Sequence, residues 1–189
     1  MVPLLDLWLP ILLSAVFVFV VSSVIHMALP IHKSDMKKLP EEDKLLAALR
    51  AHGVAPGQYM FPCAGSMKEM GTPEMLAKLK QGPVGHLTVR PSGGFSIGPS
   101  LVQWFVLSLA IGASAGYVAG MVLGAGADTT TVFRLTSTAA LLGYAFSSLQ
   151  DSIWKGVPWG VTLKFMLDGL VYALTTGATF AWLWPSAGA

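Results

Sequence analysis

The sequence predicts an all-α integral membrane protein: four transmembrane helices in a compact bundle, with a small cytoplasmic α/β insertion between helices 1 and 2. Two observations predict this class. The chain of 189 residues is 53% hydrophobic and only 12% charged, whereas globular domains average about 25% charged residues. Its apolar residues are also gathered into blocks close to the roughly 20 residues that a helix needs to cross a bilayer.

Four apolar blocks define the predicted spans and the domain organisation. The spans cover residues 7–29, 101–125, 131–149 and 161–184. The corresponding domains are a first transmembrane helix over residues 1–30, the insertion over 31–99 and a three-helix transmembrane unit over 100–189. The third block is diluted by Arg134 and several hydroxyl side chains, so we expect it to face neighbouring helices rather than lipid.

The basic residues predict the orientation of the chain. Nine of the twelve Lys and Arg residues lie between the first and second blocks, and Arg134 alone falls on the opposite side. Because basic residues collect in cytoplasmic loops, both termini are expected outside the plasma (bacterial inner) membrane, with residues 31–99 in the cytoplasm. Acidic residues interleave with the basic ones of this segment, which argues against binding to nucleic acid. The expected partners are the lipid bilayer and either other membrane subunits or a second copy of the chain.

The insertion carries its own start and stop signals. Pro40, followed by three acidic residues, predicts the start of one short helix, and Thr72 before Pro73 predicts the cap of a second. Residues 58–61 and 84–89 are predicted as short strands. We therefore expect two short helices and two short strands in this segment.

Small residues recur every fourth position in three of the four spans. They are Ser108, Gly112, Gly116, Gly120 and Gly124 in the second span, Ala139, Gly143 and Ser147 in the third, and Gly169, Ala173, Gly177 and Ala181 in the fourth. Such rows let helix backbones approach closely within a membrane. We expect them to form the internal packing surface of the bundle, with an outer end free to meet a partner. The first functional hypothesis is therefore an accessory or assembly subunit that acts through helix packing.

Two ionisable residues in the fourth span form a candidate ion or proton site. Lys164 and Asp168 lie four positions apart and so share one face of a helix. Ionisable groups within a membrane are costly and often functional, and an interfacial ion pair is the alternative. A small oligomeric carrier or channel that uses these two residues is the second functional hypothesis.

The evidence for a bound cofactor is weaker than the evidence for the candidate ion or proton site. His26 near the inner end of the first span, and Met60 and Cys63 in the insertion, are weak candidates for metal ligands. The alternative is an interfacial, hydrogen-bonding histidine and a core or membrane-facing methionine, so no metal site is predicted and the cofactor stays unknown. A metal- or pigment-binding membrane protein that uses His26 is the third hypothesis. The chain carries no familiar catalytic motif, which favours a non-enzymatic role without deciding it.

Overall fold

The computed structural model describes residues 1–94 and 96–188, and these residues form two units. The first unit contains residues 1–36 and 96–188, and the second contains residues 37–94. The sequence grouped residues 31–36 and 96–99 with the insertion. They belong to the first unit because Asp35 pairs with Lys164 of the last helix and the second long helix begins at Gly98.

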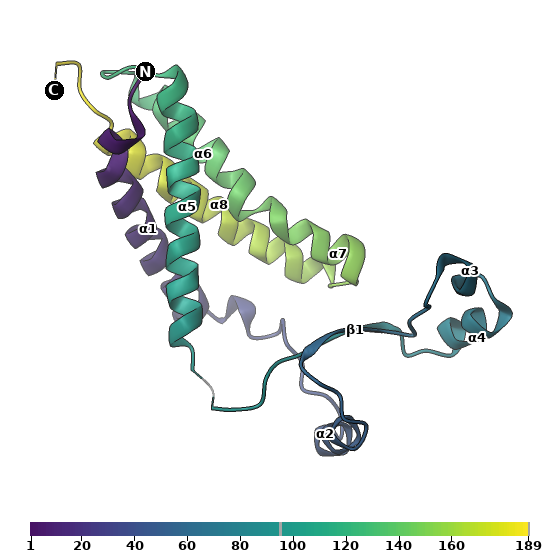
Figure 1. The fold of residues 1–189 in the computed structure, drawn as a ribbon. Coiled ribbons are helices and arrows are strands. Elements are labelled where there is room, and N and C mark those ends of the chain that lie inside the picture. Colours follow the sequence, from purple (N-terminus) through teal and green to yellow (C-terminus); the bar gives the residue numbers. More distant parts are fainter. Residues whose placement is uncertain (95, 189) are drawn as a thin grey trace. The chain divides into compact units, whose positions relative to one another are not determined.

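The first unit is a bundle of helices (Figure 1). Its elements are the 3-10 helix η1 (Leu4–Leu7), α1 (Trp8–Ser23), the π-helix η2 (Val24–Ala28), the 3-10 helix η3 (Pro30–His32), α5 (Gly98–Val122), α6 (Thr129–Tyr144), the 3-10 helix η4 (Phe146–Ser148), α7 (Leu149–Lys155) and α8 (Trp159–Leu183). Helix α1 packs against α5 and α8, and α6 also packs against α5 and α8. The two termini lie at the same end of this unit (Figure 1).

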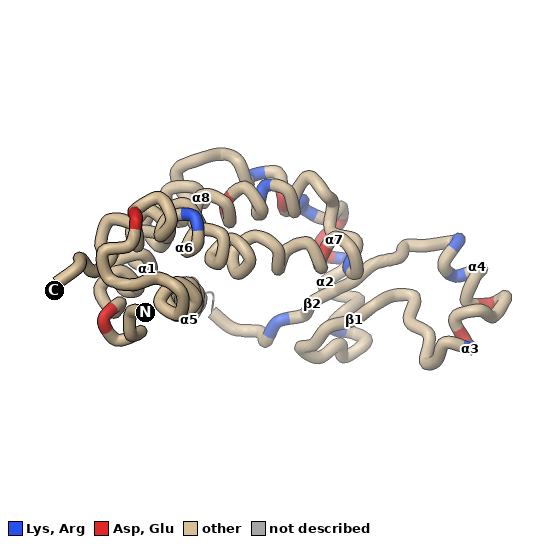
Figure 2. Tube along the Cα trace, turned by 90° about the horizontal axis from the view of Figure 1, so that it is seen from above, with Lys and Arg blue, Asp and Glu red and all other residues tan. Residues whose placement is uncertain are grey.

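Two helical stretches among the described residues are long and apolar enough to cross a membrane, namely Leu4–Ala28 and Gly98–Val122. Helices α1 and α5, which form most of them, carry no charged side chain (Figure 2). The structure thus supports two of the four predicted spans by length and composition. Helix α6 has 16 residues and so extends about 24 Å, less than the roughly 30 Å of a hydrocarbon core. Helix α8 is longer, but it contains Lys164 and Asp168.

The third predicted span differs most from the structure. Residues 131–149 were expected to form one helix, but α6 ends at Tyr144, and η4 and α7 continue the chain. Gly156 ends α7 in the left-handed conformation, with φ of 70°, which glycine adopts without steric cost. The chain then enters α8 through Pro158.

Several glycines of the predicted rows approach other segments of the same unit. A Cβ atom added at Gly112 would lie 3.0 Å from the Ser14 side chain in α1, and one added at Gly116 would lie 2.9 Å from Phe180 in α8. One added at Gly177 would lie 2.7 Å from the Ser137 side chain in α6. The glycines therefore permit close approaches within the bundle. The row does not stay helical to its end, because α5 stops at Val122, before Gly124.

Two buried clusters form the core of the bundle. One contains Val18, Ile25, Ile111, Ala115, Ala140, Tyr144, Tyr172 and Ala173. The other contains Val2, Leu7, Val132 and Phe180 and lies near the termini. Hydrogen bonds tie this end together, because the Val2 amide donates to Gly120 O at 3.0 Å and the Trp184 indole donates to Gly124 O at 2.9 Å.

The second unit is small and contains both helices and strands. Its elements are α2 (Glu42–Ala51), β1 (Gly57–Phe61), α3 (Met67–Met70), α4 (Pro73–Gln81) and β2 (Gly85–Val89). Strands β1 and β2 pair antiparallel, with Tyr59 opposite Leu87. Thr72 caps α4, because its hydroxyl accepts a hydrogen bond from the Met75 amide at 3.3 Å.

Candidate metal centre

Two histidines approach each other where the first long helix ends. His26 lies in the π-helix η2, and His32 is the last residue of η3. Between them Leu29 is extended, with φ of −93° and ψ of 142°, as expected for a residue that precedes proline. Pro30 therefore ends the helix and turns the chain back. The centroids of the two imidazole rings lie 4.5 Å apart as a result.

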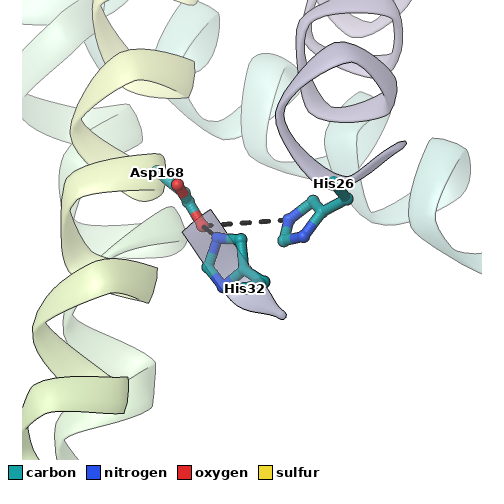
Figure 3. A group of neighbouring side chains, drawn as sticks. All are labelled: His26, His32 and Asp168. Atoms are coloured by element: carbon teal, nitrogen blue, oxygen red, sulfur yellow. Dashed lines mark ion pairs between the residues drawn. The ribbon is translucent and has the colours of Figure 1, made fainter. Parts of the chain in front are cut away.

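Helix α8 supplies a carboxylate to the same place. Asp168 Oδ2 lies 2.9 Å from His32 Nε2 and 3.8 Å from His26 Nε2. The three side chains point toward one another (Figure 3), and one potential ligand atom from each lies within 4.8 Å of the other two. The Asp168 side chain is 8% exposed and that of His32 is 13% exposed, whereas that of His26 is 39% exposed. The cluster is thus buried on the aspartate side and accessible on the His26 side.

The two closest potential ligand atoms of this cluster, His32 Nε2 and Asp168 Oδ2, do not form a hydrogen bond with each other. Within residues 1–94 and 96–188, His32 Nε2 and Asp168 Oδ2 are buried side-chain atoms that have no hydrogen-bond partner. At 2.9 Å they form an ion pair when the imidazole is protonated, but they do not form a hydrogen bond, for which alignment matters as much as distance. A buried polar atom without a partner is costly. A cation between the two atoms would satisfy both.

The hydrogen bond between His32 and Asp35 determines which ring nitrogen of His32 can bind a cation. Its Nδ1 lies 2.6 Å from Asp35 Oδ2, and because an ionised carboxylate only accepts hydrogen bonds, Nδ1 must be the donor. When the ring is neutral, Nε2 carries the lone pair and presents it to Asp168. Two ligand atoms that each lie about 2.1 Å from one ion, at tetrahedral or octahedral angles, are separated by roughly 3.0–3.4 Å. The distances of 2.9 and 3.8 Å lie on either side of that range.

Asp35 is itself held by a lysine. Lys164 Nζ lies 2.6 Å from Asp35 Oδ1, and it also donates to Ile31 O at 2.8 Å and to Ser34 Oγ at 3.2 Å. The hydrogen bond from Lys164, and then the one from His32, holds the pKa of Asp35 below its ordinary value. A carboxylate that orients a ligating histidine is the usual outer partner of a metal site. Asp35 would have that role for an ion bound by His32, with Lys164 holding Asp35 in place.

A cavity of about 740 Å³ borders the cluster. His26, Asp168 and Phe165 line it on one side, and Trp104, Tyr144 and Tyr172 form an aromatic wall. The ring centroids within this wall lie 5.6–6.0 Å apart. The Trp104 indole donates to Ser22 Oγ at 2.9 Å, which fixes the ring, and the Tyr172 hydroxyl lies 3.3 Å from His26 Nε2.

The structure distributes the sequence-predicted site residues unevenly. Lys164 and Asp168 lie on one face of α8, but Lys164 pairs with Asp35 while Asp168 faces His32, so the expected pair engages two different partners. His26, a weak candidate from sequence, lies in the cluster. Met60 lies on β1 and Cys63 is exposed in the loop that follows, both in the second unit.

Sequence reasoning missed His32 and Asp35. Both residues fall within residues 31–99, which the sequence assigned to the cytoplasmic insertion. The available signal was Pro30, because a proline at the end of an apolar helix predicts that the chain turns there. The sequence does not contain the information that this turn brings His32 against the fourth long helix.

We compared the chain with known proteins. No model of a known protein family, no curated protein and no solved structure matches this chain, so the candidate centre rests on its own geometry.

Proposed function

We propose that this chain is a membrane protein that binds one divalent transition-metal ion through His26, His32 and Asp168. The observation that supports this most directly is the pair of buried atoms, His32 Nε2 and Asp168 Oδ2, that face each other without a hydrogen bond. Two imidazoles and one carboxylate are a donor set found in zinc and non-haem iron sites. Three protein ligands leave at least one coordination position open, which is typical of sites that act on a further molecule.

The membrane arrangement belongs to the same proposal. The apolar stretches around α1 and α5 are two spans, and α8, together with the shorter α6 and the elements that follow α6, completes a four-helix bundle. The excess of basic residues between the first two spans supports a cytoplasmic location for residues 31–99, with both termini outside the bacterial inner membrane. His26 then lies at the cytoplasmic end of the first span, where a metal ion can enter from the cytoplasm.

The accessory-subunit hypothesis is not needed to explain the small residues. It rested on the rows of small residues, and the glycines of these rows that approach other segments, such as Gly112, Gly116 and Gly177, do so within the same bundle. Close packing inside the chain accounts for them without a partner. The metal-binding proposal instead accounts for a buried arrangement that packing alone does not explain.

Elemental analysis of the purified protein tests the proposal. We expect about one equivalent of zinc, iron or another first-row metal in protein purified without chelator, and we expect His32→Ala and Asp168→Asn to remove it. His52→Ala and His86→Ala are matched controls, because both histidines lie in the second unit, and they should keep the metal. Thermal unfolding shows whether each variant is folded. Folded parent protein that holds no metal, even after incubation with Zn²⁺, Fe²⁺ or Co²⁺, would refute the proposal.

A further inference from the structure

We propose that the cavity beside the metal centre binds a long-chain carboxylate, with its head group on the open coordination position and its apolar tail in the cavity. This inference rests on the proposed function, because the head group needs the metal ion. The cavity of about 740 Å³ falls within the usual range for small-molecule sites, about 300–1,000 Å³. It is therefore large enough for an organic ligand.

The cavity lining favours an apolar tail. Most of its surface is apolar, and Leu101, Ile97, Met27 and the aromatic wall contribute to it. The lining draws on both stretches that could cross a membrane, since Ser22, Ser23, His26 and Met27 come from the first and Leu101 and Trp104 from the second. A ligand that partitions into a bilayer can therefore reach the cavity from the membrane.

The charges around the centre favour a head group with one negative charge. Asp168 and Asp35 contribute two negative charges, whereas Lys164 and a divalent ion contribute three positive charges, so the occupied centre carries one excess positive charge. Asp151 also lines the cavity, but it pairs with Lys155 at 2.7 Å and adds no net charge. A carboxylate matches this charge, and its oxygen atoms suit a divalent ion with imidazole and carboxylate ligands.

Two of the candidate metal ligands border the cavity, so the head group and the apolar tail of one ligand can occupy the two sites together. His26 and Asp168 are lining residues as well as candidate ligands. The Tyr172 hydroxyl, which lies 3.3 Å from His26 Nε2, marks the polar end of the aromatic wall. A ligand that places its oxygen atoms on the ion would therefore extend its chain along Trp104 and Tyr144.

Cobalt substitution separates this inference from the proposed function. The protein is reconstituted in nanodiscs and loaded with Co²⁺, whose visible absorption reports its coordination. Hexadecanoate is then titrated and compared with hexadecanol, which has no charge, and with acetate, which has no tail. We expect hexadecanoate to change the cobalt spectrum saturably, and hexadecanol and acetate to require at least tenfold higher concentrations.

A variant that fills the cavity provides a second test of the inference. Ser147 lines the cavity and is exposed, so Ser147→Phe should weaken the hexadecanoate response at least tenfold and leave the spectrum of the cobalt protein without ligand unchanged. Ser114 is exposed on α5 and does not belong to the lining. Ser114→Phe is therefore the matched control and should respond as the parent does.

The outcomes are distinguishable. Absence of any protein-bound cobalt spectrum refutes the metal site itself. A cobalt spectrum that hexadecanoate does not alter, or alters equally in Ser147→Phe, overturns the ligand assignment and leaves the metal site standing. An equal response to acetate would show that the cavity contributes nothing, and an equal response to hexadecanol would show that the charge does not select the head group. Either result overturns the inference.

Discussion

The hydrogen bond between Asp35 and His32 predicts that a change outside the metal ligands weakens metal binding. Asp35→Asn replaces a carboxylate by an amide that has one acceptor atom and one donor group. In the protein, one carboxylate oxygen accepts from His32 and the other accepts from Lys164, each at 2.6 Å. The amide cannot accept from both neighbours in this way.

Each orientation of the amide has a cost. If its oxygen faces His32, its NH₂ group faces the Lys164 ammonium, and two donors oppose each other. If its NH₂ group faces His32, Nδ1 must become the acceptor and the proton moves to Nε2, where it occupies the lone pair that binds the ion. Loss of such an outer partner lowers metal affinity by about 10- to 100-fold in known sites, and we expect a loss in that range.

Competition titration with a chelator of known affinity measures the effect. Asp6→Asn removes an exposed carboxylate from the first unit and should leave the affinity within about twofold of the parent. Lys164→Met gives the mechanistic control. If Asp35 sets the proton on His32, Lys164→Met should raise the affinity more in the Asp35→Asn background than in the parent, because it removes the donor that opposes the amide. If Lys164→Met changed the metal affinity by the same factor in both backgrounds, the effect would be one of general charge and the tautomer argument would be refuted. A metal affinity of Asp35→Asn within twofold of the parent would also refute it.

Three further predictions concern packing and topology. A Cβ at Gly177 would lie 2.7 Å from the Ser137 side chain, so Gly177→Ala should cost about 1–3 kcal/mol of unfolding free energy, whereas Gly160→Ala on the same helix meets nothing within 4 Å and should be neutral or slightly stabilising. Equal thermal shifts for the two variants in detergent would contradict this. Phe180 is fully buried, so Phe180→Ala should lower the stability by about 3–5 kcal/mol, and a loss below 1 kcal/mol in denaturant titrations would show that the bundle end is not packed as described. Cys63 is exposed, and a membrane-impermeant maleimide should label it only after the membrane is opened. A cysteine introduced by Ser186→Cys in a Cys63→Ala background should instead react in intact cells. The reverse labelling pattern would show that the topology is inverted.

Local features of this protein follow from its sequence. Apolar stretches long enough to cross a bilayer are a matter of composition and length, and residues four apart on a helix share a face because of the helical repeat. Pro30 and Gly156 mark chain turns for equally local reasons. The sequence therefore predicted the long helices to within a few residues and singled out Asp168 as an ionisable residue within an apolar helix. It failed at the third block, because a run of mixed apolar and hydroxyl side chains does not show where α6 ends.

The candidate metal centre depends on contacts between distant segments. His26 and His32 are six residues apart, and they meet because η2, the extended Leu29 and η3 reverse the chain. Asp168 comes from α8, more than a hundred residues away, and only the packing of α8 against α1 brings it to the histidines. The sequence by itself determined which side chains can bind a metal ion, an ion pair or a neighbouring helix. The tertiary structure decided which of them meet, because the partner of a buried polar atom is set by the packing of whole helices and not by the residues beside it in the chain.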